Sequence, residues 1–479
     1  MSPDYDAIVV GAGVIGVFTA WALQARGLSV CLIDRDEGPA RQTSAANAGV
    51  IAPGYVAPFA SPGAARKAFL NLFEADRAFS WMPSKSPSQW RWLAQWLAQG
   101  TSLKYQQNRA AMFALAHFSQ GCLHAIADGL GLAYRSVAHY HVIFRTKHDF
   151  DRSEGLRHQL KLSGLEHTIL KREALFELEP ALADADLQIE AALRVQGDEA
   201  GDCAGFVEHL CERLITGGAQ WMGAVDVSAI RVKPEGVSQC VLADGRSISA
   251  KHLVLAAGPW SKELLECLEL RLPIYPIRGF SLTWDQDAMS PSAKHRVRAL
   301  GTALMDDRYK IALTPLHHGG PSSLRAAGMA LLGPPSAHEG IGIDRQREAA
   351  DTLWRIATQW FEGLEPLHRD PKTADAPPSP RFWMGSRPML PDGLPLIGRL
   401  LGAGKRGGLW INSGHGSTGW AMAAGSAYLL ADQMLGLSPE LEQRIRHEAM
   451  VVRPASRAYD LDARRFCPSR WLGRRFNTR

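Results

Sequence analysis

The hydrophobic pattern at the N-terminus predicts a buried strand, a tight turn and a helix. Residues 7–10 form a short apolar run, three glycines follow at G-x-G-x-x-G spacing, and residues 14–25 have the pattern of a helix. A second apolar run, residues 28–33, ends at Asp34. A glycine-rich turn between any buried strand and helix can look like this motif, but the second strand with its acidic end favours a dinucleotide-binding unit.

Each of the three glycines in this unit, and the aspartate that ends it, has a physical role. Gly11 permits the turn, Gly13 lets backbone N–H groups approach a pyrophosphate, and Gly16 lets the helix pack against the strand. Asp34 stands where a carboxylate accepts hydrogen bonds from a ribose diol. NAD and FAD share the ADP half that such a unit binds, so the reactive ring has to be identified from the rest of the chain.

The remaining pattern interleaves helical and strand-like segments. A β-hairpin is expected around Asp244 and Gly245, and the turn-rich, strand-like stretch over residues 272–332 predicts an antiparallel sheet in a second domain. The other predicted elements are helical patterns over 64–132, 205–215, 340–361 and 421–437, strands over 219–225, 251–257 and 407–413, and a proline-rich connection over 371–380.

A second glycine-rich turn lies near the C-terminus. The strand predicted over 407–413 is followed by Gly414, His415, Gly416 and then by the start of a helix. This order repeats that of the first unit, and it predicts a second site for an anion or for the hydrogen-bonding edge of a ring. A simple strand-to-helix connection, the alternative, does not need so many glycines.

Composition indicates a globular protein with no metal site. The 479 residues, 46% hydrophobic and 21% charged, suffice for two domains. We find no apolar run approaching the ~18 residues that span a bilayer, no signal peptide, and no metal-ligand spacing. The seven cysteines lack a C-x-x-C pair, which favours reduced thiols and a cytoplasmic location. We expect no nucleic-acid partner.

The positive charge is concentrated in the C-terminal tail. Residues 451–479 contain eight arginines and two aspartates, a balance of +6, whereas the whole chain carries +5. Phe466, Trp471, Leu472 and Phe476 are interleaved with these charges. The tail therefore either contacts an anionic membrane surface, which would place the protein peripherally at the inner membrane face, or is a solvated end.

Five blocks in order give the chain a family resemblance. They are the N-terminal fingerprint and residues 45–58, 275–279, 383–393 and 412–420. Together they resemble the FAD-dependent D-amino acid oxidase superfamily and, within it, the bacterial D-amino acid dehydrogenase small subunits. The resemblance covers nearly the whole chain and implies FAD rather than NAD. No cysteine occurs between Cys267 and Cys467, so we expect the FAD to be bound non-covalently.

The resemblance implies an α/β fold with two interleaved domains. A Rossmann-like FAD-binding domain is expected over 1–60, 195–265 and 380–440. An α+β substrate or cap domain containing an antiparallel sheet is expected over 61–194 and 266–379, and 441–479 form the basic tail.

The resemblance also assigns cofactor contacts. It implies that Asp34 holds the adenosine ribose, that Val225 lies by the adenine, and that Ala257 and Gly258 pass the pyrophosphate. Residues 47–49 and 414–418 would border the isoalloxazine, where His415 either assists or is a structural donor in a tight turn. The predicted cofactor-binding residues are Val10, Gly11, Gly13, Val14, Ile15, Gly16, Asp34, Arg35, Ser44, Asn47, Ala48, Gly49, Val225, Ala257, Gly258, Gly414, His415, Gly416, Ser417 and Thr418.

Arg387 is the predicted substrate anchor. In relatives an arginine in this Arg-Pro context binds the substrate carboxylate, and a planar guanidinium suits that role because it donates two parallel hydrogen bonds. The alternative is an ion pair with Asp392 or another acid. Three tyrosines, Tyr55, Tyr275 and Tyr309, are candidate lids or hydroxyl donors, or are ordinary packing residues.

The implied reaction is oxidative deamination of a D-amino acid. A hydride would pass from the substrate α-carbon to flavin N5, and the imino acid would hydrolyse to a 2-oxo acid and ammonia, with a quinone or another carrier accepting the electrons. A related oxidase or dehydrogenase for glycine, N-methyl amino acids or hydroxyproline, and a non-catalytic FAD-binding subunit, are the alternatives. Arg278, Phe280 and Leu331 depart from residues common in the family, lysine, tyrosine and glutamate, so substrate choice is more open than reaction type.

Overall fold

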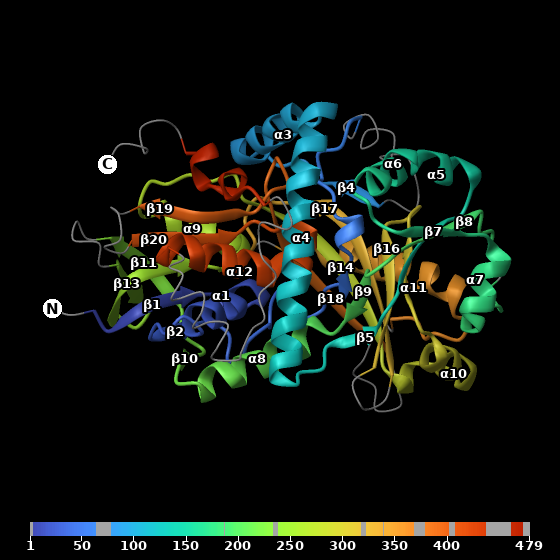
Figure 1. Cartoon of the computed structure of the whole chain (residues 1–479), viewed down its shortest axis with the longest axis horizontal. Coiled ribbons are helices and arrows are strands. Elements are labelled where there is room, and N and C mark those ends of the chain that lie inside the picture. Colours follow the sequence, from blue (N-terminus) through green and yellow to red (C-terminus); the bar gives the residue numbers. More distant parts are fainter. Residues whose placement is uncertain are drawn as a thin grey trace.

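Two large β-sheets, one in each domain, organise the fold (Figure 1). The computed structural model describes residues 3–472 apart from 64–77, 186, 233–237, 318–321, 339, 368–378, 402–407 and 437–460. The proline-rich connection and most of the basic tail therefore lie outside the described residues.

The first sheet carries the predicted nucleotide-binding unit. Its parallel core is built from β10 (Gln220–Met222), β2 (Val30–Ile33), β1 (Tyr5–Val10), β13 (Ser247–Leu255) and β20 (Gly408–Ser413). β19 (Leu396–Leu401) pairs antiparallel with β20, and the hairpin partners β12 (Ser238–Leu242) and β11 (Val227–Val232) extend β13. Val10 lies opposite both Ile33 and Leu255, so the carboxyl ends of the central strands share one edge.

Helices cover one face of this sheet. They are α1 (Val14–Gln24), α8 (Cys203–Thr216), α12 (Gly419–Leu435) and α4 (Ser102–Leu130), which share one hydrophobic core. The other face packs against the β11–β12 hairpin and α9 (Ser261–Glu266). The sheet is thus buried on both sides, which suits its nearly continuous apolar strands.

The central helix α4 packs with the nucleotide-binding domain (Figure 1). It lies within 61–194, the range predicted for the cap, but a Cβ on Gly425 of α12 would lie only 2.8 Å from Ser119 Cα, so the two helices cross closely. Among the described helices only α4 is long and apolar enough to cross a membrane by length and composition, and half of its apolar window is buried in the protein. Its contacts make it a core helix.

The second sheet forms the cap domain. Its strands, in order across the sheet, are β18 (Arg381–Met389), β14 (Tyr275–Trp284), β17 (Ser323–Leu332), β16 (Ile311–Leu316), β15 (Ala303–Asp306), β6 (Tyr140–Phe144), β8 (Ala191–Val195) and β7 (His167–Leu170), with β4 (Phe79–Trp81) beside β17. β18 falls within 380–440, predicted for the FAD domain, yet it pairs with β14 along its whole length. The strand that carries Arg387 therefore belongs to the cap sheet.

Helices pack on the outer face of the cap sheet, and a small sheet joins the domains. α10 (Pro291–Ala299) and α11 (Ile343–Trp360) cover β14, β16 and β17. The small sheet consists of β3 (Val50–Ile51), β9 (Glu199–Gly201) and β5 (Arg135–Val137). The remaining helices are α3 (Pro87–Gln99), α5 (Lys147–Arg152), α6 (Glu154–Leu162) and α7 (Arg172–Leu178).

The described part of the tail, residues 461–472, is docked on the protein. Phe466 is fully buried in the core of the helical layer, and Trp471 and Leu472 pack against the opposite face of the first sheet. Arg470 donates to Asp392 at 2.7 Å and to the Leu394 carbonyl at 2.6 Å. The side chains of Phe466, Trp471 and Leu472 thus pack against the rest of the protein. Phe476 lies outside the described residues.

Candidate active site

A cavity of about 390 Å³ opens at the carboxyl ends of the parallel strands. This is where open α/β sheets bind their ligands. The predicted cofactor residues that line it are Val10, Gly11, Gly13, Val14, Ile15, Asp34, Arg35, Ser44, Val225, Ala257, Gly258, Gly414, His415 and Gly416. Gly16, Asn47, Ala48, Gly49, Ser417 and Thr418 are not part of its lining. The cavity thus extends from the first glycine turn to the second, and both turns contribute to one site.

The first glycine turn is shaped by close backbone contacts. Gly11 has a φ of +104°, and a Cβ there would lie 2.7 Å from the Ala256 carbonyl oxygen. A Cβ on Gly16 would collide with the Gly11 carbonyl, which shows why the helix needs glycine at this crossing. The N-terminal residues of α1 line the cavity, and their N–H groups have no acceptors within the helix, so this end can receive an anionic group.

Two polar side chains hold the turn. Ser44 Oγ accepts a hydrogen bond from the Val14 N–H at 3.0 Å, and Asp34 accepts from the Ala12 and Asp36 N–H groups. Burial raises the pKa of the Asp34 carboxyl, while these hydrogen bonds oppose the shift. Each carboxylate oxygen retains a free lone pair for a ribose hydroxyl.

The outer end of the cavity includes residues that the sequence did not single out. Arg35 stacks on the Trp260 indole, with its guanidinium carbon 3.9 Å from the ring centroid. His338, from the cap domain, reaches the same edge and lies 3.0 Å from Glu263. Trp260 could have been identified from the sequence, because it directly follows Gly258 and Pro259 at the end of a predicted strand. No sequence pattern places His338 at this site.

The second glycine turn closes the inner end. His415 is buried, and its Nε2 lies 3.0 Å from Ser426 Oγ. Because the Ser426 hydroxyl donates its proton to the Ala423 carbonyl, Nε2 is the protonated nitrogen and donates to Ser426. Burial lowers the pKa of His415 to about 3, so the ring is neutral. Nδ1 is then a buried acceptor without a protein partner among the described residues.

The segment predicted to border the isoalloxazine is fixed by the cap sheet. The Asn47 carbonyl accepts from Arg325 Nη1 at 3.1 Å, and the Ala48 carbonyl accepts from Thr314 Oγ1 at 2.7 Å. A Cβ on Gly49, which has a φ of +71°, would lie 2.6 Å from the Gly201 carbonyl oxygen. Arg325 is a supporting residue that sequence inspection missed, because its role depends on strands far apart in the chain.

Arg387 has no acidic partner among the described residues. Its Nη1 and Nη2 donate to the carbonyls of Met329 at 2.5 Å and Gly328 at 3.2 Å, and the guanidinium lies against Gly279. Met329 adopts a φ of +55° at a bulge in β17, which directs the two carbonyls to the arginine. Burial lowers the pKa of Arg387 to about 10. Asp392, the alternative partner, pairs with Arg470 instead, so no ion pair to Asp392 is present.

The three tyrosines lie in different surroundings, and none lines the cofactor cavity. Tyr55 donates to Asp307 at 2.5 Å and accepts from Lys310 at 3.0 Å. Tyr275 is buried, donates to the Gly333 carbonyl and packs on Trp92. Tyr309 is half-buried beneath Arg145. The position of Tyr275 fits a packing role, whereas Tyr55 belongs to a polar cluster at the domain boundary.

The residues of the elongated cavity fit FAD. The positive end of α1, the Asp34 carboxylate and the unpaired acceptor on His415 line one space that reaches both glycine turns, as a dinucleotide with a ring system requires. The sequence matches the family described as FAD dependent oxidoreductase (DAO) over residues 6–433. The chain belongs to the DAO family of FAD-dependent oxidoreductases. The predicted α/β fold, the FAD cofactor and enzymatic amino acid oxidation are thereby confirmed.

Relatives of this DAO-family chain match it over almost their full length. It is 34% identical to D-amino acid dehydrogenase of Agrobacterium fabrum, covering 94% of this chain and 100% of the relative. It is 35% identical to D-amino acid dehydrogenase of Azorhizobium caulinodans, covering 91% and 97%. Glycine oxidase from Geobacillus kaustophilus shares the fold, with a TM-score of 0.61 at 20% identity over 90% of this chain and 95% of that structure.

Proposed function

We propose that this enzyme is a D-amino acid dehydrogenase that forms a 2-oxo acid and ammonia. The observation that carries the proposal is Arg387, whose half-buried guanidinium is held by two backbone carbonyls and by no carboxylate among the described residues. A largely desolvated cation in this state is stabilised by an anionic partner, and a substrate carboxylate supplies one. The two relatives named D-amino acid dehydrogenase support the stereochemistry.

The face of the cap sheet beside Arg387 suits an uncharged substrate side chain. Ala312, Ala327, Ser281 and Trp383 form one row across β16, β17, β14 and β18, as the strand registers show. Directly paired residues point to the same face of a sheet. On the same face, two residues further along, the pair is Gly279 and Gly385, and the Arg387 guanidinium lies against Gly279. We therefore propose D-amino acids with apolar side chains of moderate size.

The protein groups bind and orient the substrate in this proposal. Bound FAD supplies the two-electron acceptor for the oxidation of the α-carbon. In this proposal Arg387 binds the substrate carboxylate, and the row of small residues with Trp383 contacts the substrate side chain. These contacts would hold the substrate C–H bond in a fixed orientation toward the flavin and exclude water. No protein base is assigned, because the substrate amine gives up its proton to water before it binds, and the lone pair of the neutral amine then assists loss of the hydride from the α-carbon.

An anaerobic reduction screen tests this function. FAD-loaded enzyme is mixed with D-, L- and N-methyl amino acids and with glycine, and the flavin absorbance is followed. D-leucine and D-methionine should bleach the flavin, and Arg387→Leu should retain FAD but need far more substrate. Reduction by L- or N-substituted amino acids alone would contradict the proposal, and bleaching by none would indicate a non-catalytic subunit.

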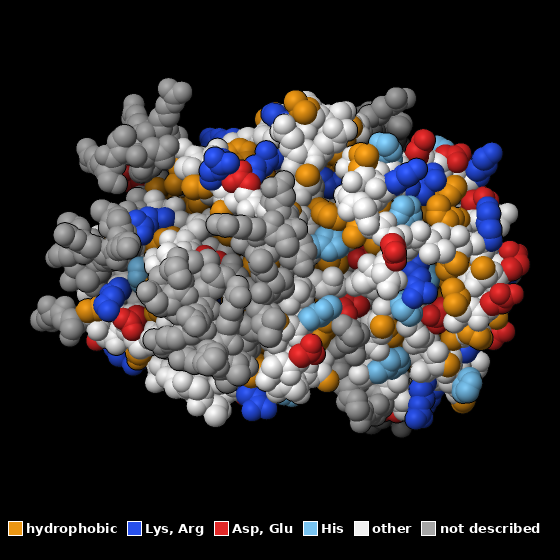
Figure 2. Space-filling model, viewed as in Figure 1, with side chains coloured by type: hydrophobic (Ala, Val, Ile, Leu, Met, Phe, Trp, Pro, Cys, Tyr) orange, Lys and Arg blue, Asp and Glu red, His pale blue; other side chains and the backbone are white. Residues whose placement is uncertain are grey.

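We also propose a quinone as electron acceptor, with the protein in the cytoplasm at the inner membrane face. The names of the relatives as dehydrogenases support an acceptor other than oxygen. Acidic and basic side chains are interspersed on the cap side of the face shown in Figure 2, and we assign the membrane contact to the basic tail. We assign it to Arg474, Arg475 and Arg479, because Arg470 of the same tail pairs with Asp392.

Reoxidation and vesicle binding test these two points separately. Reduced enzyme should be reoxidised faster by ubiquinone-1 than by air, and equal rates would favour an oxidase. The full chain should sediment with phosphatidylserine vesicles at low salt, and replacement of Arg474, Arg475 and Arg479 by glutamine should weaken this binding. Unchanged sedimentation of the variant would refute the role of the tail.

A further inference from the structure

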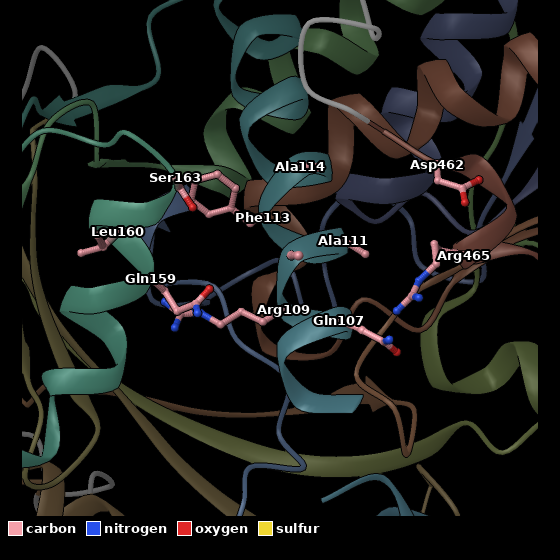
Figure 3. A pocket seen from close by; sticks show the side chains of 11 residues that line it. Gln107, Arg109, Ala111, Phe113, Ala114, Gln159, Leu160, Ser163, Asp462 and Arg465 are labelled. Atoms are coloured by element: carbon pink, nitrogen blue, oxygen red, sulfur yellow. The ribbon is translucent and has the colours of Figure 1, made fainter. Parts of the chain in front are cut away.

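A second cavity, of about 370 Å³, lies along α4 and shares no lining residue with the cofactor cavity. Its floor is the side of α4 that carries Arg109, Ala111, Phe113 and Ala114. Figure 3 shows α6 on one side of this helix and the C-terminal residues Asp462 and Arg465 on the other. The cavity is therefore built from three segments that are distant in the sequence.

Arg109 is a buried cation to which the described residues supply no hydrogen-bond or ion-pair partner. Its side chain is inside the protein, with the residue 7% exposed, and its guanidinium makes no hydrogen bond or ion pair with a described residue. Figure 3 shows Arg109 and Gln159 of α6 directed toward one another. Burial lowers the pKa of Arg109, while the nearby hydroxyls of Tyr105 and Tyr55 oppose the shift. A guanidinium that is removed from water in this way is stabilised strongly by an anion.

A second guanidinium faces the same space from the tail. Arg465 lines the cavity, and its Nη2 donates to Asn108 Oδ1 at 3.0 Å. Asn108 is fixed in turn by a hydrogen bond to the Asp392 carbonyl at 3.1 Å. Arg465 is thus positioned by an uncharged amide, and it retains N–H donors for a ligand.

The one acid in the lining lies with the arginines of the tail. Asp462 accepts from Arg464 Nε at 2.9 Å and from Arg464 Nη2 at 3.1 Å, and the charge of Arg465 also acts on its carboxylate. Arg109, by contrast, has no acid beside it among the described residues. The lining also includes the side chains of Phe113, Ala111 and Ala114, so the cavity combines the charge of Arg109 with an apolar wall.

We propose that this cavity binds a carboxylate that has an apolar body. The carboxylate would pair with Arg109, because a planar guanidinium and a carboxylate form strong charge-assisted hydrogen bonds. Arg465, which approaches from the other side of α4, would add positive charge at that end of the cavity. The apolar body would lie on Phe113, Ala111 and Ala114. The volume is in the range of small-molecule sites. Two sources have this chemistry: a fatty acid, and an apolar 2-oxo acid such as the product of the proposed reaction.

Isothermal titration calorimetry on the FAD-loaded full-length protein tests the site. The probes are decanoate, its neutral analogue decanamide, and 4-methyl-2-oxopentanoate, the last in an Arg387→Leu background so that the substrate anchor does not contribute. The variants are Arg109→Gln, Arg109→Lys and, as a matched control on the neighbouring α6, Lys161→Gln. Melting temperature and FAD content show that each variant is folded.

At least one carboxylate should bind once per chain, and Arg109→Gln should weaken that binding at least about tenfold. Arg109→Lys should restore part of it, Lys161→Gln should leave it nearly unchanged, and decanamide should not bind. Binding of decanoate alone assigns a fatty acid, and binding of the 2-oxo acid assigns the product. Equal binding to Arg109→Gln, equal binding of decanamide, or no binding of either carboxylate would overturn the proposal. Because no probe requires turnover, these outcomes are independent of the proposed activity.

Discussion

Replacing Gly279 with alanine tests how Arg387 is positioned without removing the arginine itself. An added Cβ would lie 2.7 Å from Arg387 Nη1 and closer still to Cζ and Nη2. Ordinary contacts begin at about 3.5 Å, so the guanidinium has to move by roughly 1 Å. It would then leave the Met329 and Gly328 carbonyls, which fix its orientation now.

The magnitude follows from that displacement. A misplacement of about 1 Å costs about 100-fold in rate, which corresponds to about 2.7 kcal/mol of transition-state stabilisation. We expect kcat/KM for a D-amino acid to fall by roughly this factor, mostly through a higher KM, because the anchor and not the cofactor site is changed. FAD content should stay as in the unmodified enzyme, since Gly279 does not line the cofactor cavity.

Anaerobic stopped-flow reduction over a range of substrate concentrations measures both quantities. Gly340→Ala is the matched control, because a Cβ at this cap-domain glycine meets no atom within 4 Å. Gly279→Ala enzyme that saturates at the same substrate concentration as Gly340→Ala, and is reduced at the same rate, would refute the claim that Arg387 binds the substrate carboxylate from its observed position.

Gly11→Ala should yield protein with little flavin absorbance, because the new Cβ would clash with the turn at a φ of +104°; normal FAD content would contradict this role. Burial raises the pKa of Asp198 to about 8, so the native state holds this proton more tightly than the unfolded chain, and stability should fall between about pH 4 and 8 by at most about 1.4 kcal/mol per pH unit. Asp198→Asn should remove that loss of stability. If the melting temperatures of the variant and the unmodified enzyme changed with pH in the same way, Asp198 would not be its source. Arg470→Ala should destabilise the protein by about 3 kcal/mol, because it leaves the buried Asp392 carboxylate without its ion-pair partner. Arg464→Ala, which removes an exposed ion pair, should change the melting temperature little. Equal changes in melting temperature would argue against a stabilising Arg470–Asp392 pair.

Those parts of the site that are built from one continuous stretch of the chain could be predicted from the sequence. The first unit places β1, the glycine turn, α1 and β2 within a single stretch, so its pattern and its chemistry can be recognised together. The helix predicted over 14–25 spans Val14–Gln24. The same holds for the second glycine turn, whose strand and helix flank it directly.

The sequence could not show which distant groups meet. Arg387 depends on carbonyls at Gly328 and Met329, which a bulge in another strand directs toward it. Asp392 finds Arg470, and α4 joins the nucleotide-binding layer although its neighbours in sequence belong to the cap. Such pairings are set by sheet order and helix packing, and a hydrophobic pattern identifies only which face is buried.

The strand order has a consequence for how the enzyme acquires its cofactor during synthesis. β1 and α1 are synthesised before the cap domain, whereas β20 and the turn at Gly414 and Gly416, which complete the cavity, are synthesised after it. Domains usually fold as units as the chain is made, yet here the FAD-binding unit cannot close until the cap has been translated. The complete FAD cavity therefore exists only after the cap and both flanking parts of the FAD-binding domain have been synthesised, and FAD that binds there stabilises the folded chain over the unfolded one.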